Sequence, residues 1–219
     1  LTSTSVNNPI TGANTIADGL PTSEIVYDAR GNTTTLADMT FTYDGANRHT
    51  STTYADGSKT TLIWDATRRV AARTVDPAGA PPAVTTQLLY SGTGDGVWGQ
   101  RTASVVVRNV GLPGGVSAAM SSSTQGAWSF PSVLGHTMIT SDGTATSGIQ
   151  MYDPFGQPVD LSTLAIGTAV ADDKNTVQGN SGWHASQLKF ADTVGSTVII
   201  EMGARIYVPA LGRFLEDDP

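Results

Sequence analysis

Two adjacent carboxylates, Asp217 and Asp218, stand near the end of the chain, where they could take part in acid–base chemistry. An aspartyl hydrolase needs two carboxyl groups in one site, because like charges about 3 Å apart separate their pKa values. One group then keeps its proton while the other activates water. Consecutive residues of a strand point to opposite faces, so Asp217 and Asp218 do not form such a pair by themselves. The partner has to come from elsewhere.

The other polar residues have no spacing typical of a known catalytic or metal site. The three histidines, His49, His136 and His184, form neither an HxxxH nor an HExxH pattern, and cysteine is absent. No G-x-S-x-G motif surrounds a serine, and the glycine-rich run at 91–99 is neither a Walker loop nor a dinucleotide fingerprint. We therefore expect no metal and no cofactor, and we interpret 91–99 as a hairpin tip or bulge.

The composition indicates an all-β protein. The 219 residues include 24 Gly and 11 Pro with few strong helix formers, and only 14% are charged. The net charge of −7 and the lack of clustered Lys and Arg disfavour nucleic-acid binding. No apolar run approaches the ~20 residues that a membrane helix needs, so we expect no membrane span.

An aromatic residue followed by Asp recurs along the chain, with the acids at Asp28, Asp44, Asp65 and Asp153. In the first three copies the aromatic ends a half-apolar run, as in SEIVY, MTFTY and TTLIW. The Asp can accept a hydrogen bond from the amide two residues on, and a following Gly or Asn tolerates positive φ. We predict that the Asp shapes a turn while the aromatic packs on the neighbouring hairpin. The spacing of oxygen ligands does not fit a calcium loop.

The intervals between these copies are those of β-hairpins. Tyr27, Tyr43 and Trp64 are 16 and 21 residues apart, about the length of two short strands with their turns. Repeated hairpins predict a sheet in which each unit contacts mainly its neighbours. A long loop is expected over 160–183, and further strands are expected at 86–90, 104–109, 136–140, 148–152 and 197–202.

The end of the chain carries a longer motif. The run IIEMGARIYVPALGRFLEDDP covers 199–219, and it resembles the core signature associated with RHS repeats. The aromatic–Asp copies resemble the YD repeat of the same family, and the middle segments LPGGVS and WSFPSVLGHTMITSDGTATSGIQMYDPFGQPV resemble its actinobacterial-type members. The matching signature residues are Gly203, Arg205, Tyr207, Pro209, Leu211, Gly212, Arg213, Phe214, Leu215, Asp218 and Pro219.

The resemblance implies a fold and a function. It implies stacked antiparallel hairpins that form part of a curved sheet or cage wall, with YD repeats over 1–110 and the RHS-associated core, or plug, over 111–219. The family encloses a C-terminal toxin cargo in a shell, so the implied partners are the rest of the same polypeptide and that cargo. It also implies a polymorphic toxin or a relative of toxin-complex C subunits, secreted or on the cell surface, of which this chain is a piece.

The resemblance also implies a catalytic pair for aspartyl-type autoproteolysis. Arg205 and Asp218, thirteen residues apart, match the family's Arg and closing Asp. Val208 stands where the commoner motif has Asp, and the segment with the expected cut site is not in this sequence, so we expect the isolated fragment to be inactive. The alternative is an Arg205–Asp218 salt bridge that only fixes the core.

Two other functions remain open from the sequence. The chain could belong to a secreted or cell-surface YD-repeat protein that binds glycans or mediates adhesion, with Trp64, Trp98, Trp128 and Trp183 as stacking surfaces. Alternatively, self-processing could be the main activity. Repeated aromatics at the hairpin period are more often packed between stacked units, which favours the shell.

Overall fold

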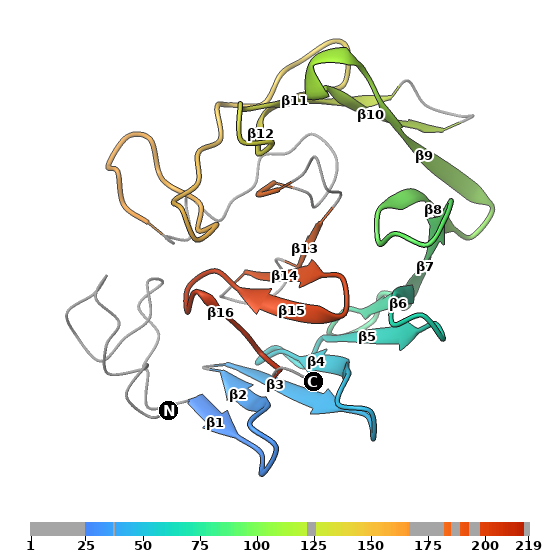
Figure 1. The fold of residues 1–219 in the computed structure, drawn as a ribbon, viewed down its shortest axis with the longest axis vertical. Helices are drawn as coiled ribbons and strands as arrows, with labels where there is room; N and C mark the ends of the chain where they lie inside the picture. Colours follow the sequence, from blue (N-terminus) through green and yellow to red (C-terminus); the bar gives the residue numbers. More distant parts are fainter. Residues whose placement is uncertain are drawn as a thin grey trace.

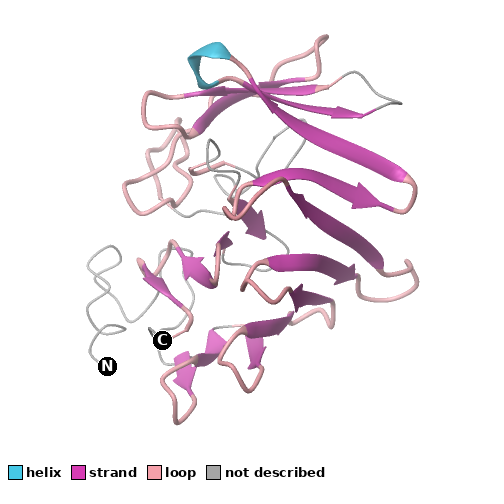
Figure 2. Cartoon of the chain, turned by 45° about the vertical axis from the view of Figure 1, so that its right-hand side comes forward, coloured by secondary structure: helices cyan, strands magenta, loops and turns pink. Residues whose placement is uncertain are grey.

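The computed structural model describes residues 25–36, 38–121, 126–166, 182–184, 189–192 and 198–216. Antiparallel strands supply nearly all the regular structure in these ranges, and the one helical segment there is a short 3-10 turn at Pro113–Gly115 (Figure 2). Within the described residues, no helix is long and apolar enough to cross a membrane. The predicted all-β fold is confirmed.

Twelve strands form one sheet, and each strand is hydrogen-bonded to the next one along the chain. We call this sheet the wall. Its strands are β1 (Ile25–Tyr27), β2 (Thr33–Leu36), β3 (Met39–Tyr43), β4 (His49–Thr53), β5 (Lys59–Trp64), β6 (Val70–Asp76), β7 (Val84–Tyr90), β8 (Val97–Thr102), β9 (Val105–Gly111), β10 (Ser117–Ser121), β11 (Ala127–Pro131) and β12 (Thr137–Ser141).

A second sheet of four antiparallel strands comes from the end of the chain, and we call it the plug. Figure 1 shows the wall curving through a wide arc from β1 to β12, with the plug on its concave side. The sheet is open, as expected for part of a cage wall. The plug strands are β13 (Phe190–Asp192), β14 (Ile199–Met202), β15 (Arg205–Val208) and β16 (Arg213–Phe214).

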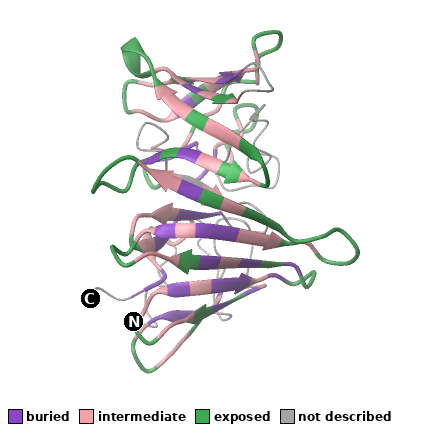
Figure 3. Cartoon of the chain, turned by 90° about the vertical axis from the view of Figure 1, so that its right-hand side faces the viewer, coloured by how far each residue is buried: buried purple, intermediate pink, exposed green. Residues whose placement is uncertain are grey.

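The main hydrophobic core lies between wall and plug. It combines wall residues of β2 to β8, such as Leu36 and Leu62, with plug residues such as Ile206 and Val208. Strand β3 alternates buried and exposed positions, because successive side chains point to opposite faces. Figure 3 shows the same alternation of buried and exposed residues along other strands, and exposed loops at the hairpin ends.

Four of the five further strands expected after residue 80 are present. Strand β7 includes the one at 86–90, and β9, β12 and β14 overlap those at 104–109, 136–140 and 197–202 but begin one or two residues later. The prediction of a strand at 148–152 is wrong. The amides of Ser147 and Gln150 do donate to the carbonyls of Thr140 and Met138 in β12. The two donors are three residues apart while the two acceptors are only two apart, so the segment does not form a regular ladder with β12.

The predicted loop at 160–183 is only partly visible. Over 160–166 the chain makes a turn and a single bridge between Val159 and Ile166, which agrees with a loop. Residues 167–181 lie outside the described ranges. The run at 91–96 joins β7 to β8, so the interpretation of 91–99 as a hairpin tip is confirmed for that part.

Candidate functional site

Each aromatic–Asp copy forms a five-residue corner with the same hydrogen bonds, and the Asp is its acceptor. In the second corner, Asp44 Oδ1 accepts from the amides of Ala46 at 2.9 Å and Arg48 at 3.0 Å. In the third, Asp65 Oδ1 accepts from the amides of Thr67 and Arg69 at 2.8 and 3.0 Å. The predicted bond to the amide two residues on is confirmed, and the second bond, four residues on, was not foreseen.

The residue three positions after the Asp has positive φ in every corner. It is glycine or Asn in three of them, with φ of 87° at Gly31, 66° at Asn47 and 96° at Gly156. In the third corner Arg68 takes φ of 63°, so the expectation of Gly or Asn fails there. This conformation costs a β-carbon-bearing residue strain, which the two amide bonds to Asp65 offset.

These bonds change the acidity of the corner carboxyls. The backbone amide of Arg69 is the largest influence on Asp65, and with Thr67 it holds the pKa of that carboxyl far below its ordinary value. At Asp44, burial alone would raise the pKa, but the hydrogen bonds from Arg48 and Ala46 outweigh it and the pKa is lowered. Asp44 and Asp65 are therefore ionised at neutral pH and act as hydrogen-bond acceptors.

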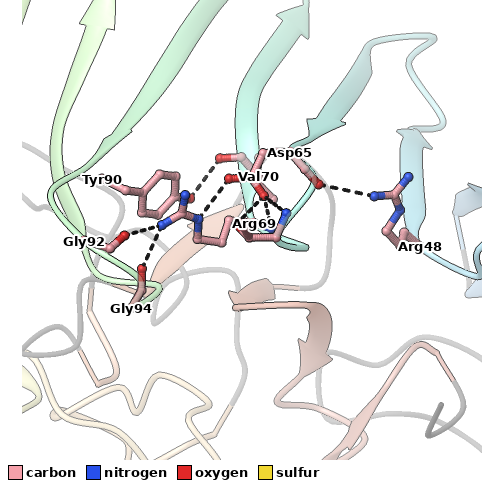
Figure 4. A network of polar contacts seen from close by, with 8 residues as sticks. Arg48, Asp65, Arg69, Val70, Tyr90, Gly92 and Gly94 are labelled. Atoms are coloured by element: carbon pink, nitrogen blue, oxygen red, sulfur yellow. Dashed lines mark hydrogen bonds and ion pairs between the residues drawn. The ribbon is translucent and has the colours of Figure 1, made fainter.

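The residue four positions after the Asp links one corner to the next. Arg69 donates from Nε to Asp65 Oδ2 at 2.9 Å, and its Nη1 reaches the carbonyls of Gly92 and Gly94 at 2.6 and 3.2 Å in the next unit (Figure 4). Arg48 holds Asp44 in the same way, and its Nη1 lies 3.5 Å from the Asp65 carbonyl. The arginines therefore tie successive hairpins together along one edge of the wall.

Two aromatics of the aromatic–Asp copies, Tyr43 and Trp64, form a second ladder with Tyr90 of β7. For Tyr43 and Trp64 this confirms that the aromatic packs on the neighbouring hairpin. Tyr43 OH donates to the Thr33 carbonyl at 2.6 Å, Trp64 Nε1 to the His49 carbonyl at 2.6 Å, and Tyr90 OH to the Val70 carbonyl at 2.8 Å. In each case the acceptor lies five residues after the Asp of the preceding corner. This constant offset and the polar aromatic at each repeat are both visible in the sequence. They could have predicted these hydrogen bonds, but no hydrogen bond was predicted from them.

The last residues of the plug join the two sheets by their backbone. The amide of Leu215 donates to the Ile206 carbonyl of β15 at 2.8 Å, and the Leu215 carbonyl accepts from the Thr33 amide of β2, also at 2.8 Å. Arg213 adds a side-chain contact, because its Nη1 donates to Tyr27 OH at 3.2 Å. The end of the plug therefore lies on the first hairpins of the wall.

Ion pairs add to the contact between plug and wall. Arg73 of β6 and Glu201 of β14 are both nearly buried, with Nε and Oε1 3.9 Å apart. Lys189, just before β13, pairs with Asp95 at the β7–β8 tip. Asp95 also lies against the turn between β14 and β15, where a β-carbon on Gly203 would come within 2.8 Å of its Oδ2.

Only half of the predicted catalytic pair is visible. Arg205 opens β15, and its guanidinium carbon lies 3.8 Å from the centre of the Phe214 ring. Asp218 lies outside the described residues, so the pairing of Arg205 with Asp218 and their catalytic roles stay a prediction. Among the described residues, Glu216 is an acidic group whose pKa responds to the charge of Arg205.

Glu216 is a functional candidate that the sequence did not reveal. Its residue is 5% exposed, and Oε2 accepts from the Ile206 amide at 2.9 Å. Burial raises the pKa of its carboxyl to about 7, although the amides of Ile206 and His49 and the charge of Arg205 act in the opposite direction. In the sequence it is one of three consecutive acids, and nothing there distinguishes the buried one.

The remaining two histidines lie together at the other side of the plug. His136 Nδ1 accepts from the His184 amide at 3.0 Å, and the His136 ring stacks on Trp183. Trp183 in turn stacks on Tyr207 of β15, with ring centres 5.4 Å apart. Burial, with the charge of His184, lowers the pKa of His136. These rings have structural neighbours, and within the described ranges no three His, Cys, Asp or Glu residues gather as a metal site would require.

The comparisons with known proteins agree with this geometry. Residues 43–81, which hold the second and third corners, match the family model described as RHS Repeat. No curated protein sequence matches the chain. Residues 43–81 therefore carry an RHS repeat, as the motifs of this part of the chain predicted.

The solved structures that it resembles include three that carry TccC3 in their names. The crystal structure of TcdB2-TccC3 matches with a TM-score of 0.62 and 16% identity over 88% of this chain. The Photorhabdus luminescens Tc holotoxin pore matches with 0.59 and 15%, and TcdB2-TccC3 without hypervariable C-terminal region with 0.60 and 15%, each over 88% of this chain. The chain spans only about a tenth of those chains, from 9% to 10% of their length. At this identity the likeness shows a shared fold.

Proposed function

We propose that this chain is a structural segment of a shell that encloses a toxin cargo located after it in the same polypeptide. The observation that carries the proposal is the packing of the plug into the concave face of the wall, with Ile206, Val208 and Leu215 in one core with Leu36 and Leu62. A wall whose inner face is covered by the end of the plug would separate a C-terminal cargo from the solvent.

Two further observations support it. The corner ladders join each hairpin to the next through backbone acceptors, so the wall can be extended by repetition. One of the structures that the chain resembles is named for the removal of a hypervariable C-terminal region, as expected of a constant shell with variable contents. On this proposal residues 1–110 are the YD-repeat hairpins and residues 111–219 are the core region, which includes strands β10 to β12 of the wall. The protein is secreted or displayed on the cell surface.

We infer that aspartyl-type self-cleavage releases the cargo, with Arg205 and Asp218 as the catalytic residues. Arg205 opens β15, and the next residue, Ile206, accepts a hydrogen bond from Leu215 in the segment that leads to Asp218. A guanidinium there could hold a carboxylate ionised or polarise the scissile carbonyl. The second carboxyl would come from outside this sequence.

The cargo proposal is tested on the natural polypeptide, expressed with its own sequence beyond residue 219. Limited proteolysis should leave the C-terminal region intact while the shell is folded, and digest it at the rate of the isolated region once urea opens the shell. Digestion at equal rates in both states would overturn the proposal, and so would a polypeptide that ends at residue 219.

The cleavage proposal is tested on the same polypeptide by mass spectrometry. Asp218→Asn and Arg205→Gln should leave it uncut, while Asp160→Asn, at an exposed turn, should be processed like the wild type. Complete processing of Asp218→Asn would remove the catalytic assignment and leave the shell proposal standing. Glycan binding stays untested. Trp64 and Trp183 are both engaged within the fold, whereas Trp98 is 43% exposed.

A further inference from the structure

We propose that Glu216 is a proton-controlled latch, which holds the end of the plug on the wall while its carboxyl group is neutral and loosens it when the group ionises. The latch concerns the docking of the plug, so it requires neither a cargo nor a cleavage step. It goes beyond the shell function because it states the pH range in which the end of the plug, residues 215–216, stays docked on the wall.

The two carboxyl oxygens of Glu216 have different surroundings. Oε2 accepts from the Ile206 amide, whereas Oε1 is buried and has no hydrogen-bond partner among the described residues. A carboxylate oxygen removed from water without a partner is costly, and a neutral carboxylic acid is much less so. The raised pKa of about 7 follows from this burial. The site therefore favours the protonated group.

The charged and titratable groups around Glu216 come from three elements, and each has another contact. From β15, Arg205 lies over the ring of Phe214. From β4, His49 is 1% exposed, with Nε2 3.0 Å from Thr52 Oγ1.

The third element is β3, which contributes Tyr43. Its OH donates to the Thr33 carbonyl, and its pKa is raised first by burial and then by the charges of Glu216 and Asp28. Oε1 has no hydrogen-bond donor within bonding distance among the described residues. The backbone amides of Ile206, Glu216 and His49 and the charge of Arg205 favour the ionised carboxyl less than burial disfavours it, so ionisation leaves a buried negative charge that they only partly balance.

The position of Glu216 couples its ionisation to the docking of the plug on the wall. It directly follows Leu215, whose amide and carbonyl bridge Ile206 of the plug and Thr33 of the wall. A group with a pKa raised above its unfolded value adds stability that is present in full below the unfolded pKa of about 4.5 and is lost as pH rises through about 7. Rising pH therefore weakens the bridge at Leu215 before it affects the rest of the wall.

The test measures hydrogen exchange of single amides in the 219-residue chain between pH 5 and 8, as protection factors corrected for intrinsic rates. The amides of Thr33 and Ile206, which donate to the end of the plug, should lose protection by up to about tenfold per pH unit within this window. The Tyr54 amide, which donates within a wall hairpin, should stay constant.

Two variants decide the cause. Glu216→Gln keeps an acceptor for the Ile206 amide but cannot ionise, so Thr33 should keep the same protection across the window. Glu201→Gln makes the same change on β14 and should retain the wild-type pH slope. An unchanged slope in Glu216→Gln overturns the latch, as does a parallel loss at Thr33 and Tyr54 in the wild type.

A second measurement covers the case in which Glu216→Gln does not fold. The sequence has three glutamates, Glu24, Glu201 and Glu216, so isotope labelling of glutamate with Glu201→Gln as background leaves few carboxyl signals. The infrared band of a protonated carboxylic acid should be present at pH 6 and absent at pH 8. No protonated glutamate at pH 6 would overturn the proposal.

Discussion

The two halves of the wall have the same hairpin architecture but differ in what covers their inner face. Strands β2, β3 and β5 to β8 place large apolar side chains in the core that they share with the plug. Among the described residues, β9 to β12 contribute none to that core, and their large side chains such as Val105, Met120 and Phe130 are exposed. Their buried residues are small or polar, as at Ala118 and Thr140. The difference teaches that contact with the plug, rather than the strands themselves, makes the core.

Corner chemistry does not explain this difference. The corner between β11 and β12 repeats the geometry of the aromatic–Asp corners with Ser132 as the acceptor, whose Oγ lies 3.2 Å from the amides of Leu134 and His136. Gly135 has φ of 81°, like the third residue after each Asp. Corners therefore shape the hairpin ends in both halves of the wall. Whether large side chains on the inner face are buried depends on whether the plug covers them.

The largest expected effect comes from removing a plug side chain from the shared core. Ile206 is 1% exposed in β15, so Ile206→Ala should lower the free energy of unfolding by about 2–5 kcal/mol through lost burial and a cavity. Ile149→Ala is the matched change at a site that is 58% exposed, and it should cost under about 0.5 kcal/mol. Urea titration measures both. Equal costs would show that the plug does not make the core.

The Arg73–Glu201 pair gives the next effect, because it joins β6 to β14 where both side chains are nearly buried. A double-mutant cycle of Arg73→Met and Glu201→Gln should give a coupling free energy of about 1–2 kcal/mol, since the two residues contact each other. The unfolding free energies of the four proteins measure it. Additive costs would mean that this pair does not help to hold the plug.

A smaller effect should follow from breaking one step of the aromatic ladder. Tyr43→Phe removes the OH that donates to the Thr33 carbonyl and keeps the ring, so the unfolding free energy should fall by about 1 kcal/mol. Tyr90→Phe, which removes the equivalent bond to Val70, serves as a second test of the same kind. A Tyr43→Phe protein as stable as the wild type would show that the ring packing of Tyr43, and not its hydrogen bond, contributes to stability.

The smallest effect is confined to acid. The pKa of Asp65 is lowered mainly by the Arg69 amide, so its contribution is present above the unfolded pKa of about 4 and is lost as pH falls below it. Asp65→Asn should therefore narrow the stability difference between pH 6 and pH 3. Ile149→Ala, at a site that is 58% exposed, is the control and should leave that difference unchanged. This sign is opposite to that at Glu216, so acid weakens the corners while neutral pH loosens the latch.

Much of the wall could be predicted from short-range patterns. The copies at Asp28, Asp44 and Asp65 predicted turns, and the turns are there, because an Asp oxygen bonding to an amide two residues on is a local event. The strand predicted at 148–152 from the same kind of short-range pattern is absent, since the apolar residues of this segment run beside β12 without matching its register. Arg68 at positive φ was equally unpredictable, because the surrounding bonds impose a conformation that its residue type disfavours.

The candidate site was harder to predict. Arg205 came from the motif, but the group that meets its charge is Glu216, whose burial depends on hairpins about 170 residues earlier in the chain, since His49 and Glu216 are 167 apart. Adjacent acids look alike in a sequence. The pKa of Glu216 is raised because the folded wall and plug bury this one acid.

The sequence by itself determined the hairpins, their corners and the class of protein, because alternation, Asx turns and glycine conformation act over a few residues. The tertiary structure alone decided which half of the wall is covered, how the plug is tied to the first hairpins, and which carboxyl is buried. Those outcomes arise where distant segments exclude water from one another, and water exclusion depends on the packed arrangement rather than on residue type.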